Sequence, residues 1–374
     1  MAGGPPGPST PVPGIPDVYA VVYVHTADEP GPSAGAGEPA DPAAIRSPDA
    51  ANAGRAGAAG GAAAAAPATD RAESPGSPSA CSFDEVCCLD GEPSAQSADE
   101  RDVSGWHLGQ WTPSWTPTEH AAAVDAVREA IGRGDVYQVN VVGHASAPYR
   151  GDPAPALRRV AELPGARYGG VLAGNGWALA TASLETLVEV RDGRVITRPI
   201  KGTRPATGPG RRELLASAKE RAEHVMIVDL ERNDLARLPE LGPVTVDELF
   251  AVRRWVDLWQ AESVVSAPIE SPLDLADLLR AVCPGGSVTG APKLAALAEI
   301  AALEPVGRGV SMGAVGWIGP DHLDLGLSIR TVAVDGTHVH AWAGGGITWD
   351  SDPTAEVEEA AAKAAPIRAA LAGP

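Results

Sequence analysis

The clearest candidate for chemistry in this chain is a lysine, Lys201, in the run Arg-Pro-Ile-Lys-Gly-Thr-Arg at residues 198–204. An arginine lies at each end of this run, and like charges disfavour the protonated form of an amine, as any partial burial would. A lysine whose amine is neutral near pH 7 can act as a nucleophile. An ordinary surface lysine in a turn is the alternative, which only the rest of the chain can exclude.

A β-hairpin is expected to present Lys201. The stretches 177–190 and 195–200 are rich in β-forming residues, and Asp192-Gly193 between them is typical of a type I′ turn. Pro199, two residues before the lysine, fixes one backbone angle, and Gly202, directly after it, lets another chain segment or a ligand approach closely. The sequence therefore predicts that Lys201 is displayed in a short rigid loop at the end of a strand.

Four glutamates could bind a metal ion. They form two pairs with a spacing of three residues, each in a predicted helix: Glu220 with Glu223, and Glu356 with Glu359. Residues at that spacing share a helix face, so two such helices could offer up to four carboxylates to one hard cation. Mg²⁺ is the natural candidate. Solvated helix faces are the alternative, since Glu359 and Lys363 also have the spacing of an ordinary i,i+4 ion pair.

Glycine-rich segments and one arginine could bind an anion. The loop 284–293 lacks the Lys-Ser/Thr of a Walker motif, but it precedes a predicted helix whose start could bind an anion, and Lys293 adds charge. The run Gly344-Gly345-Gly346 follows a predicted strand and could expose backbone amides, with a flexible turn as the alternative. Arg330 is expected in the middle of a strand, where it needs an acidic partner or an anionic ligand.

Strands and helices are mixed without a regular βαβ alternation. Helices are predicted over 117–131, 155–162, 211–237, 273–282, 294–303 and 356–371, and strands over 17–24, 135–142, 177–190, 195–200, 244–246, 252–266, 313–318, 325–334 and 338–343. Several strand pairs are joined by tight turns. This pattern favours an α+β fold with substantial antiparallel sheet over a doubly wound parallel sheet.

Composition divides the 374 residues into three parts. Residues 1–28 hold one strand segment, 29–104 form a low-complexity insertion that is expected to be disordered, and 105–374 form the folded domain that contains the candidate site residues. The net charge of −19 argues against a nucleic-acid or anionic-membrane surface. Four cysteines without a C-x-x-C pair indicate a reduced compartment, and no signal peptide or membrane span is visible. A cytoplasmic protein is therefore expected.

Seven runs of the chain, taken in order, resemble the chorismate-utilising enzymes. They are 134–140 (GDVYQVN), 183–185 (SLE), 199–203 (PIKGT), 222–234 (AEHVMIVDLERND), 284–293 (PGGSVTGAPK), 329–331 (IRT) and 343–352 (AGGGITWDSD). The resemblance covers about residues 105–374, and it implies the fold of that family, two packed and largely antiparallel sheets flanked by helices.

Within this family the run 199–203 resembles component I of aminodeoxychorismate synthase, because anthranilate synthases usually carry alanine where this chain has Lys201. The resemblance implies that Lys201 attacks C2 of chorismate as the C4 hydroxyl leaves. Ammonia then enters at C4 and the lysine is expelled. Glu185 would be the general acid for the departing hydroxyl, which requires a carboxyl that is protonated near neutral pH.

The resemblance also implies which residues bind the substrate and the metal. The expected Mg²⁺ ligands are Glu223, Glu356 and Glu359, with Glu220 adjacent. The expected chorismate-binding residues are Arg330, Gly344, Gly345, Gly346, Lys363, Lys293, Thr289 and Thr203. Together with Lys201 and Glu185 they complete the site that the sequence predicts.

Ammonia is expected from a separate glutamine amidotransferase subunit or from solution, and the product would lead to p-aminobenzoate for folate or a secondary metabolite. Anthranilate synthase component I, an isochorismate or salicylate synthase, and a catalytically weak binding paralogue remain alternatives. Two departures from the family pattern bear on them. Gln260 stands three residues before Ser263 where a histidine is common, and Trp317 stands where a tyrosine is common.

Overall fold

The structure is a computed structural model that describes residues 105–255, 258–319 and 322–373. The expected segments 1–28 and 29–104, with the strand 17–24, lie outside the described residues. The helices are α1 (Pro117–Arg133), α2 (Ala154–Ala161), α3 (Gly208–Ala216), α4 (Ala218–Leu235), α5 (Leu275–Val282), α6 (Lys293–Leu303), α7 (Pro353–Ala372) and the short 3-10 helix η1 (Gly286–Val288). None of these described helices is long and apolar enough to cross a membrane.

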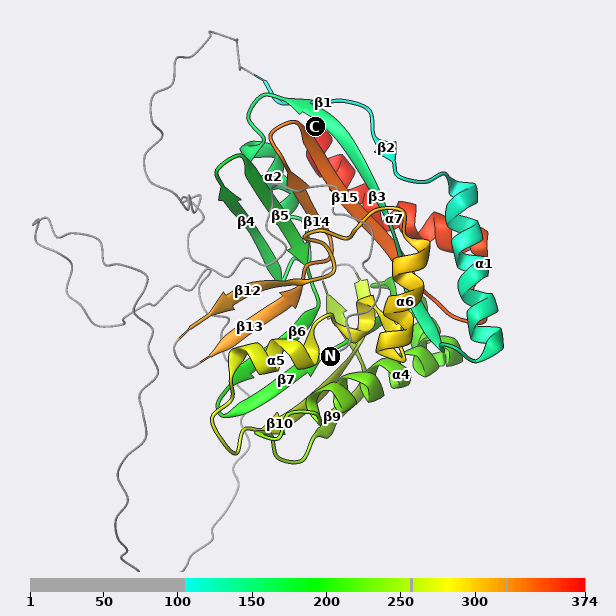
Figure 1. The fold of residues 1–374 in the computed structure, drawn as a ribbon, viewed down its shortest axis with the longest axis vertical. Coiled ribbons are helices and arrows are strands. Elements are labelled where there is room, and N and C mark those ends of the chain that lie inside the picture. Colours follow the sequence, from blue (N-terminus) through cyan, green and yellow to red (C-terminus); the bar gives the residue numbers. More distant parts are fainter. Residues whose placement is uncertain (1–104, 256–257, 320–321, 374) are drawn as a thin grey trace, which may run out of the picture. The chain divides into compact units, whose positions relative to one another are not determined.

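The strands form two sheets, shown in Figure 1. The first contains β1 (His107–Leu108), β2 (Thr112–Pro113), β3 (Gln138–Arg150), β4 (Tyr168–Gly174), β5 (Trp177–Ser183), β11 (Gly290–Ala291), β14 (Thr331–Val334) and β15 (His338–Ile347). The second contains β6 (Thr186–Arg191), β7 (Arg194–Arg198), β8 (Ile200–Pro205), β9 (Thr245–Trp255), β10 (Leu258–Pro268), β12 (Ala314–Ile318) and β13 (Leu323–Leu327).

The two sheets pack against each other and are flanked by helices. Their main paths run β1-β3-β15-β14-β5-β4 and β12-β13-β6-β7-β10-β8, and neighbouring strands in both paths are antiparallel. One core cluster joins Val142 and Trp342 of the first sheet to Val188 and Val265 of the second. The α+β fold with largely antiparallel sheets that the sequence predicts is confirmed.

Two of the places where the chain crosses between the sheets touch each other, and they are called here the first and the second crossover. At the first, the chain leaves the first sheet after β5, passes through Leu184 and Glu185, and enters the second sheet as β6; at the second, it returns between β13 and β14 through residues 328–330. The backbone NH of Leu327 donates to the carbonyl of Glu185 at 3.0 Å, and the NH of Ala182 donates to the carbonyl of Arg330 at 3.0 Å. The predicted single strands 177–190 and 325–334 are therefore wrong, because each is split by a crossover.

The predicted turn at Asp192-Gly193 is confirmed, since both residues have positive φ, 50° and 70°. It joins β6 to β7. Lys201, however, lies within β8, not in a loop, because β8 continues the sheet by pairing with β10. The predicted single helix 211–237 is two helices, α3 and α4, which meet at Ser217. The side chain of Ser217 accepts a hydrogen bond from the NH of Glu220 and so starts a new helix there.

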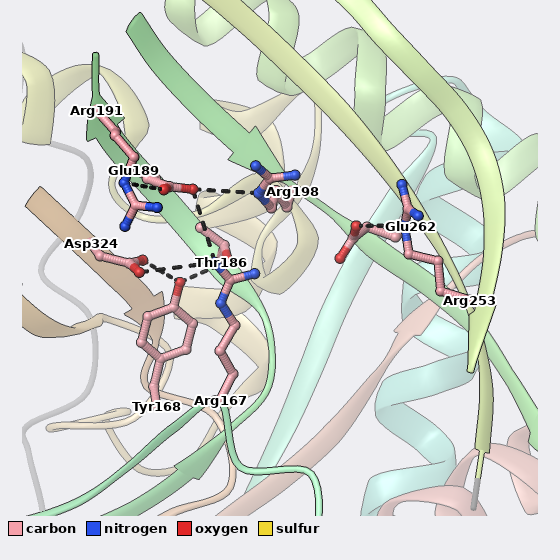
Figure 2. A network of polar contacts seen from close by, with 9 residues as sticks. All are labelled: Arg167, Tyr168, Thr186, Glu189, Arg191, Arg198, Arg253, Glu262 and Asp324. Atoms are coloured by element: carbon pink, nitrogen blue, oxygen red, sulfur yellow. Dashed lines mark hydrogen bonds and ion pairs between the residues drawn. The ribbon is translucent and has the colours of Figure 1, made fainter. Parts of the chain in front are cut away.

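A network of ion pairs and hydrogen bonds fixes β6 against its neighbours (Figure 2). The buried carboxylate of Glu189 on β6 lies 3.2 Å from the guanidinium of Arg191 and 3.5 Å from that of Arg198 on β7. The hydroxyl of Tyr168 on β4 lies 2.7 Å from that of Thr186 and donates to Asp324 of β13 at 2.5 Å. Buried charge-assisted contacts of this kind hold the strand that follows Glu185 in one position.

Candidate active site

Lys201 and Glu185 lie together where the two sheets meet. The Nζ atom of Lys201 donates to the carbonyl of Ser287 at 3.1 Å, and the carboxyl of Glu185 is 3.5 Å from the NH of Ile200, next to the lysine. Burial lowers the pKa of Lys201, against the opposing effect of the Glu185 carboxylate. Burial likewise raises the pKa of Glu185, which is only 7 % exposed. Both shifts favour a neutral amine beside a neutral carboxylic acid.

Gly202 is the extra residue of a β-bulge that sets the direction of the lysine. Thr203 pairs with Gln260 and Lys201 with Ala261, so Gly202 has no partner on β10, and its φ is 79°. A Cβ at this position would lie 2.7 Å from Leu214 and 2.8 Å from the carboxylate of Glu220. Bulges re-aim side chains near functional sites, and here only glycine fits both the angle and the space.

Arg330 lies in the second crossover and not in the middle of a strand, which corrects the sequence interpretation. It adopts a φ of 49°, a conformation that few residues other than glycine adopt. Its side chain is partly buried, and burial lowers the pKa of the guanidinium. No described residue forms an ion pair or a hydrogen bond with that guanidinium. A strained, partly buried and unpaired cation suits an anionic ligand.

The three glycines lie inside β15, whereas the sequence placed them just after a strand, with a flexible turn as the alternative. Gly344, Gly345 and Gly346 pair with Val142, Val141 and Asn140 of β3. A Cβ at Gly345 would lie 3.0 Å from a carboxylate oxygen of Glu356 and 3.7 Å from both Glu359 and Lys363 of α7. The absence of side chains at these three positions therefore opens a space beside two of the expected metal ligands and one of the expected substrate-binding lysines.

A Gly344→Ala substitution should test this close packing. The new Cβ would overlap the carbonyl oxygen of Val141 on the neighbouring strand, and backbone cannot move aside easily. We expect a loss on the order of 3 kcal/mol in the free energy of unfolding, measured by urea denaturation. Gly170→Ala on β4 is the matched control, because nothing lies within 4 Å of a Cβ there. Equal stability of the two variants would contradict the prediction.

The four expected metal ligands come from α4 and α7. The carboxylate of Glu356 accepts from the Ser351 hydroxyl at 2.7 Å, and that of Glu359 pairs with Lys363 at 2.6 Å. Glu223 lies 3.8 Å from Lys219, and Glu220 pairs with Arg204 at 3.0 Å. In the described part of the chain, no three such side chains are arranged to hold one metal ion.

The charges of this carboxylate group nevertheless fit a cation. Burial raises the pKa of Glu223, and Glu220 and Glu356 add to that effect. Burial also raises the pKa of Glu356, with a further contribution from Glu359. Burial opposes ionisation of Glu359 too, but its pairing with Lys363 prevails and lowers its pKa. Carboxylates that lie close together repel one another, and a hard divalent cation bound between them would stabilise their charged forms.

The loop between α5 and α6 connects Lys201 to the glycine strand. Its η1 end provides the Ser287 carbonyl, and its β11 end pairs Ala291 with Gln138 of β3. Arg308 holds this loop by donating to the carbonyl of Val288 at 2.6 Å and to that of Asn140 at 2.8 Å. The loop thus fixes the lysine relative to the strands of the first sheet.

Three expected substrate-binding residues form no hydrogen bond or ion pair with the Lys201 and Glu185 pair or with the glycine strand among the described residues. The ammonium of Lys293 pairs with Asp234 at 2.6 Å and, within the described chain, forms no hydrogen bond or ion pair with another expected site residue. The hydroxyl of Thr289 is fully buried and donates to the carbonyl of Gly285 at 2.8 Å. Thr203 is exposed on β8. By contrast, Lys363 also donates to the carbonyl of Gly344 at 3.0 Å and so contacts the glycine strand.

Gln138 is a site residue that the sequence did not single out. It is 1 % exposed, and neither its amide nitrogen nor its amide oxygen has a hydrogen-bond partner among the described residues. Its nitrogen lies 2.7 Å from the position of a Cβ on Gly346. The sequence carried two signals, the polar side chain within a predicted strand and its place in the run 134–140 that resembles the family. Buried polar groups of this kind in folded proteins bind a ligand or a water.

The two departures from the family pattern have clear places in the structure. Gln260 is buried on β10, while Ser263 obtains a histidine partner from another element, since its hydroxyl lies 2.6 Å from the ring of His224 on α4. Burial lowers the pKa of His224 to about 4, so the ring is neutral. Trp317 is exposed on β12 and stacks edge-on against His322. It lies at the far end of the second sheet from β8.

The family follows from comparison with known proteins. Residues 70–369 match the family described as chorismate binding enzyme. The chain belongs to the chorismate-binding enzyme family. Its residues are 41 % identical over 257 residues to anthranilate synthase component 1 of Streptomyces coelicolor, covering 67 % of this chain and 50 % of that protein. They are 37 % identical over 256 residues to aminodeoxychorismate synthase component 1 of Klebsiella aerogenes, covering 67 % and 57 %.

Solved structures of chorismate-binding enzymes share the fold. Anthranilate synthase component I of Streptococcus pneumoniae superimposes with a TM-score of 0.64 at 31 % identity, covering 74 % of this chain and 63 % of that one. The menaquinone-specific isochorismate synthase of Escherichia coli gives 0.62 at 21 % identity, covering 72 % and 65 %, and shows the fold alone. The chain spans only about half the length of the first curated relatives it matches.

Proposed function

We propose that this chain is an aminodeoxychorismate synthase component I, which converts chorismate and ammonia to 4-amino-4-deoxychorismate. The observation that carries the proposal is Lys201, an amine that burial holds toward its neutral form beside the buried carboxyl of Glu185. Relatives of similar identity are named for both this activity and anthranilate synthesis. The lysine favours the first, because anthranilate synthases usually have alanine at this position.

The proposed reaction uses the two residues in sequence. The neutral amine of Lys201 forms a bond to C2 of chorismate, both ring double bonds shift toward C4, and the C4 hydroxyl leaves as water with a proton from Glu185, whose carboxylate takes up the proton that the alkylated amine releases. Ammonia then bonds to C4, both double bonds shift back, and the lysine leaves C2 as an amine, taking the proton that the new C4 nitrogen releases. Arg330 and the glycine strand would hold the enolpyruvyl carboxylate, as the unpaired guanidinium and the open space beside Gly345 suggest. Gln138 is neutral at every pH and would position substrate by hydrogen bonding.

Glu223, Glu356 and Glu359 would hold a Mg²⁺ ion, with Glu220 adjacent. When bound, Mg²⁺ would neutralise the ring carboxylate of chorismate. We expect that Glu356→Gln raises the Mg²⁺ concentration needed for half-maximal turnover by about tenfold or more, because a charged oxygen ligand is lost. Glu358→Gln on the exposed face of the same helix is the control. Titration of metal-stripped protein with MgCl₂ measures both, and an identical response of the two variants would contradict the assignment.

The activity itself is tested with purified full-length chain, chorismate, Mg²⁺ and ammonium, followed by mass spectrometry with and without an added aminodeoxychorismate lyase. Appearance of p-aminobenzoate only with the lyase supports the proposal. Anthranilate as the product would favour anthranilate synthase component I, and isochorismate or salicylate the related synthases. Unchanged chorismate, even with a glutamine amidotransferase subunit present, would favour a binding paralogue.

A further inference from the structure

A buried ion pair lies just after α6, between the two halves of the candidate site. Glu304 directly follows the last residue of that helix, and its carboxylate pairs with the guanidinium of Arg308 at 2.6 Å. Glu304 is only 4 % exposed. Burial raises the pKa of its carboxyl, and the hydrogen bonds and the charge of Arg308 oppose that rise. The arginine therefore offsets part of the cost of burying the carboxylate.

This ion pair takes the place of a neighbouring strand along one edge of β3. The two-residue strand β11 pairs with the start of that edge. Further along, the carbonyl of Asn140 accepts a hydrogen bond from Nη2 of Arg308 at 2.8 Å, and the NH of Val142 donates to the carboxylate of Glu304 at 2.9 Å. An adjacent strand would offer the same donor and acceptor. Asn140 and Val142 also pair with glycines of β15, so the ion pair fixes the strand beside the glycine strand.

The same guanidinium holds the loop that contacts Lys201 and Glu185. Nη1 of Arg308 donates to the carbonyl of Val288 at 2.6 Å. The preceding residue is Ser287, whose own carbonyl accepts from Nζ of Lys201 at 3.1 Å. Burial raises the pKa of Glu185, and a hydrogen bond with the Ser287 side chain is among the effects that oppose the rise. A series of short polar contacts therefore connects β3, through Arg308 and this loop, to both proposed catalytic groups.

We propose that Arg308 is a positioning residue for Lys201, and that Glu304 orients its guanidinium. The inference rests on the proposed function, in which the amine of Lys201 must reach C2 of a chorismate whose enolpyruvyl carboxylate lies against the glycine strand. Arg308 bonds to the loop on one side and to β3 on the other, and so sets the position of the amine relative to that strand. Its planar guanidinium donates to two carbonyls and one carboxylate at fixed angles. The ammonium of a lysine does not reproduce this geometry.

The test compares Arg308→Lys with the wild-type chain, using chorismate, Mg²⁺ and ammonium chloride. The variant keeps a positive charge beside Glu304 but loses the planar bridge. We expect kcat to fall about a hundredfold, because a catalytic group displaced by roughly 1 Å loses about that much rate. The KM for chorismate should stay within about threefold, since Arg330 belongs to the second crossover and Arg308 forms no hydrogen bond with it among the described residues.

Arg280→Lys is the matched control, because Arg280 is exposed on α5 and pairs with Asp277 of the same helix at 2.6 Å. It should keep the wild-type kcat and the wild-type KM for chorismate. Glu304→Gln is a second variant, which keeps an acceptor for the NH of Val142 but loses the charge that orients Arg308. It should lower kcat about tenfold, again with the KM for chorismate nearly unchanged.

A second measurement does not depend on turnover. Hydrogen exchange followed by mass spectrometry should show faster exchange of peptides from residues 284–291 in Arg308→Lys than in the wild type, because the loop has lost an anchor. Peptides from α2, which packs elsewhere on the first sheet, should exchange equally in the two chains.

A wild-type kcat in Arg308→Lys would overturn the proposal. A lower kcat accompanied by faster exchange throughout the domain would also overturn it, since that result indicates general destabilisation. If the wild-type chain forms no aminated product, the proposed function fails. Faster exchange confined to the loop would then still support the positioning of Lys201 by Arg308, and unchanged exchange would exclude it.

Discussion

Lys201→Ala is expected to reduce ammonium-dependent turnover of chorismate by about a thousandfold or more, because the substitution removes the proposed nucleophile. Binding of chorismate should persist, since the residues proposed to hold its carboxylates and the metal lie on β15, α4, α7 and the second crossover. Product formation is followed with the coupled lyase, and chorismate binding by the ligand-dependent rise in melting temperature.

Two further variants at Lys201 separate nucleophilicity from charge. Lys201→Met has nearly the shape of lysine without the amine, and Lys201→Arg keeps a positive charge that cannot be removed near neutral pH. We expect both to be as inactive as Lys201→Ala. Substantial turnover by the arginine variant would mean that position 201 contributes charge only, and wild-type turnover by the alanine variant would contradict the covalent role altogether.

The sequence predicted correctly those turns and helix starts that depend only on neighbouring residues. The type I′ turn at Asp192-Gly193 is fixed by two residues that tolerate positive φ, and α1 begins where Thr116 and Glu119 form a capping box. Neither feature depends on the rest of the fold. The family motifs, in turn, identified Lys201 and Glu185, which the structure places together.

Features that depend on contacts distant in sequence were not predictable. Leu184 directly follows the residues of β5, and Arg330 directly precedes those of β14. No glycine or proline marks either point at which the chain changes sheets, so in the sequence each crossover looked like part of a continuous strand. The ion pair between Lys293 and Asp234 was not predictable, because the two residues are on different helices and 59 positions apart in the sequence. The unpartnered amide of Gln138 becomes visible only when every neighbour of the side chain is known.

Arg330→Met should change binding and stability in opposite directions. Among the described residues nothing pairs with the guanidinium, and burial already lowers its pKa. Replacing it by an apolar side chain of similar length should therefore leave the melting temperature of the ligand-free chain unchanged or raise it. Affinity for chorismate should fall by about a hundredfold or more, since a charge-assisted bond to a carboxylate in a partly buried site is lost. Thermal denaturation with and without chorismate measures both effects.

Arg232→Met is the matched control, because Arg232 is exposed on α4 and, among the described residues, pairs with nearby Asp229 alone, at 2.8 Å. The Arg232→Met chain should have nearly the same melting temperature and the same affinity for chorismate as the wild type. The opposing effects at Arg330 distinguish a ligand-binding cation from a structural one. If Arg330 were structural, its substitution would lower the stability of the chain with or without ligand. Suppose that the Arg330→Met chain unfolds more easily but binds chorismate as the wild type does. The strained crossover would then serve folding and not substrate binding.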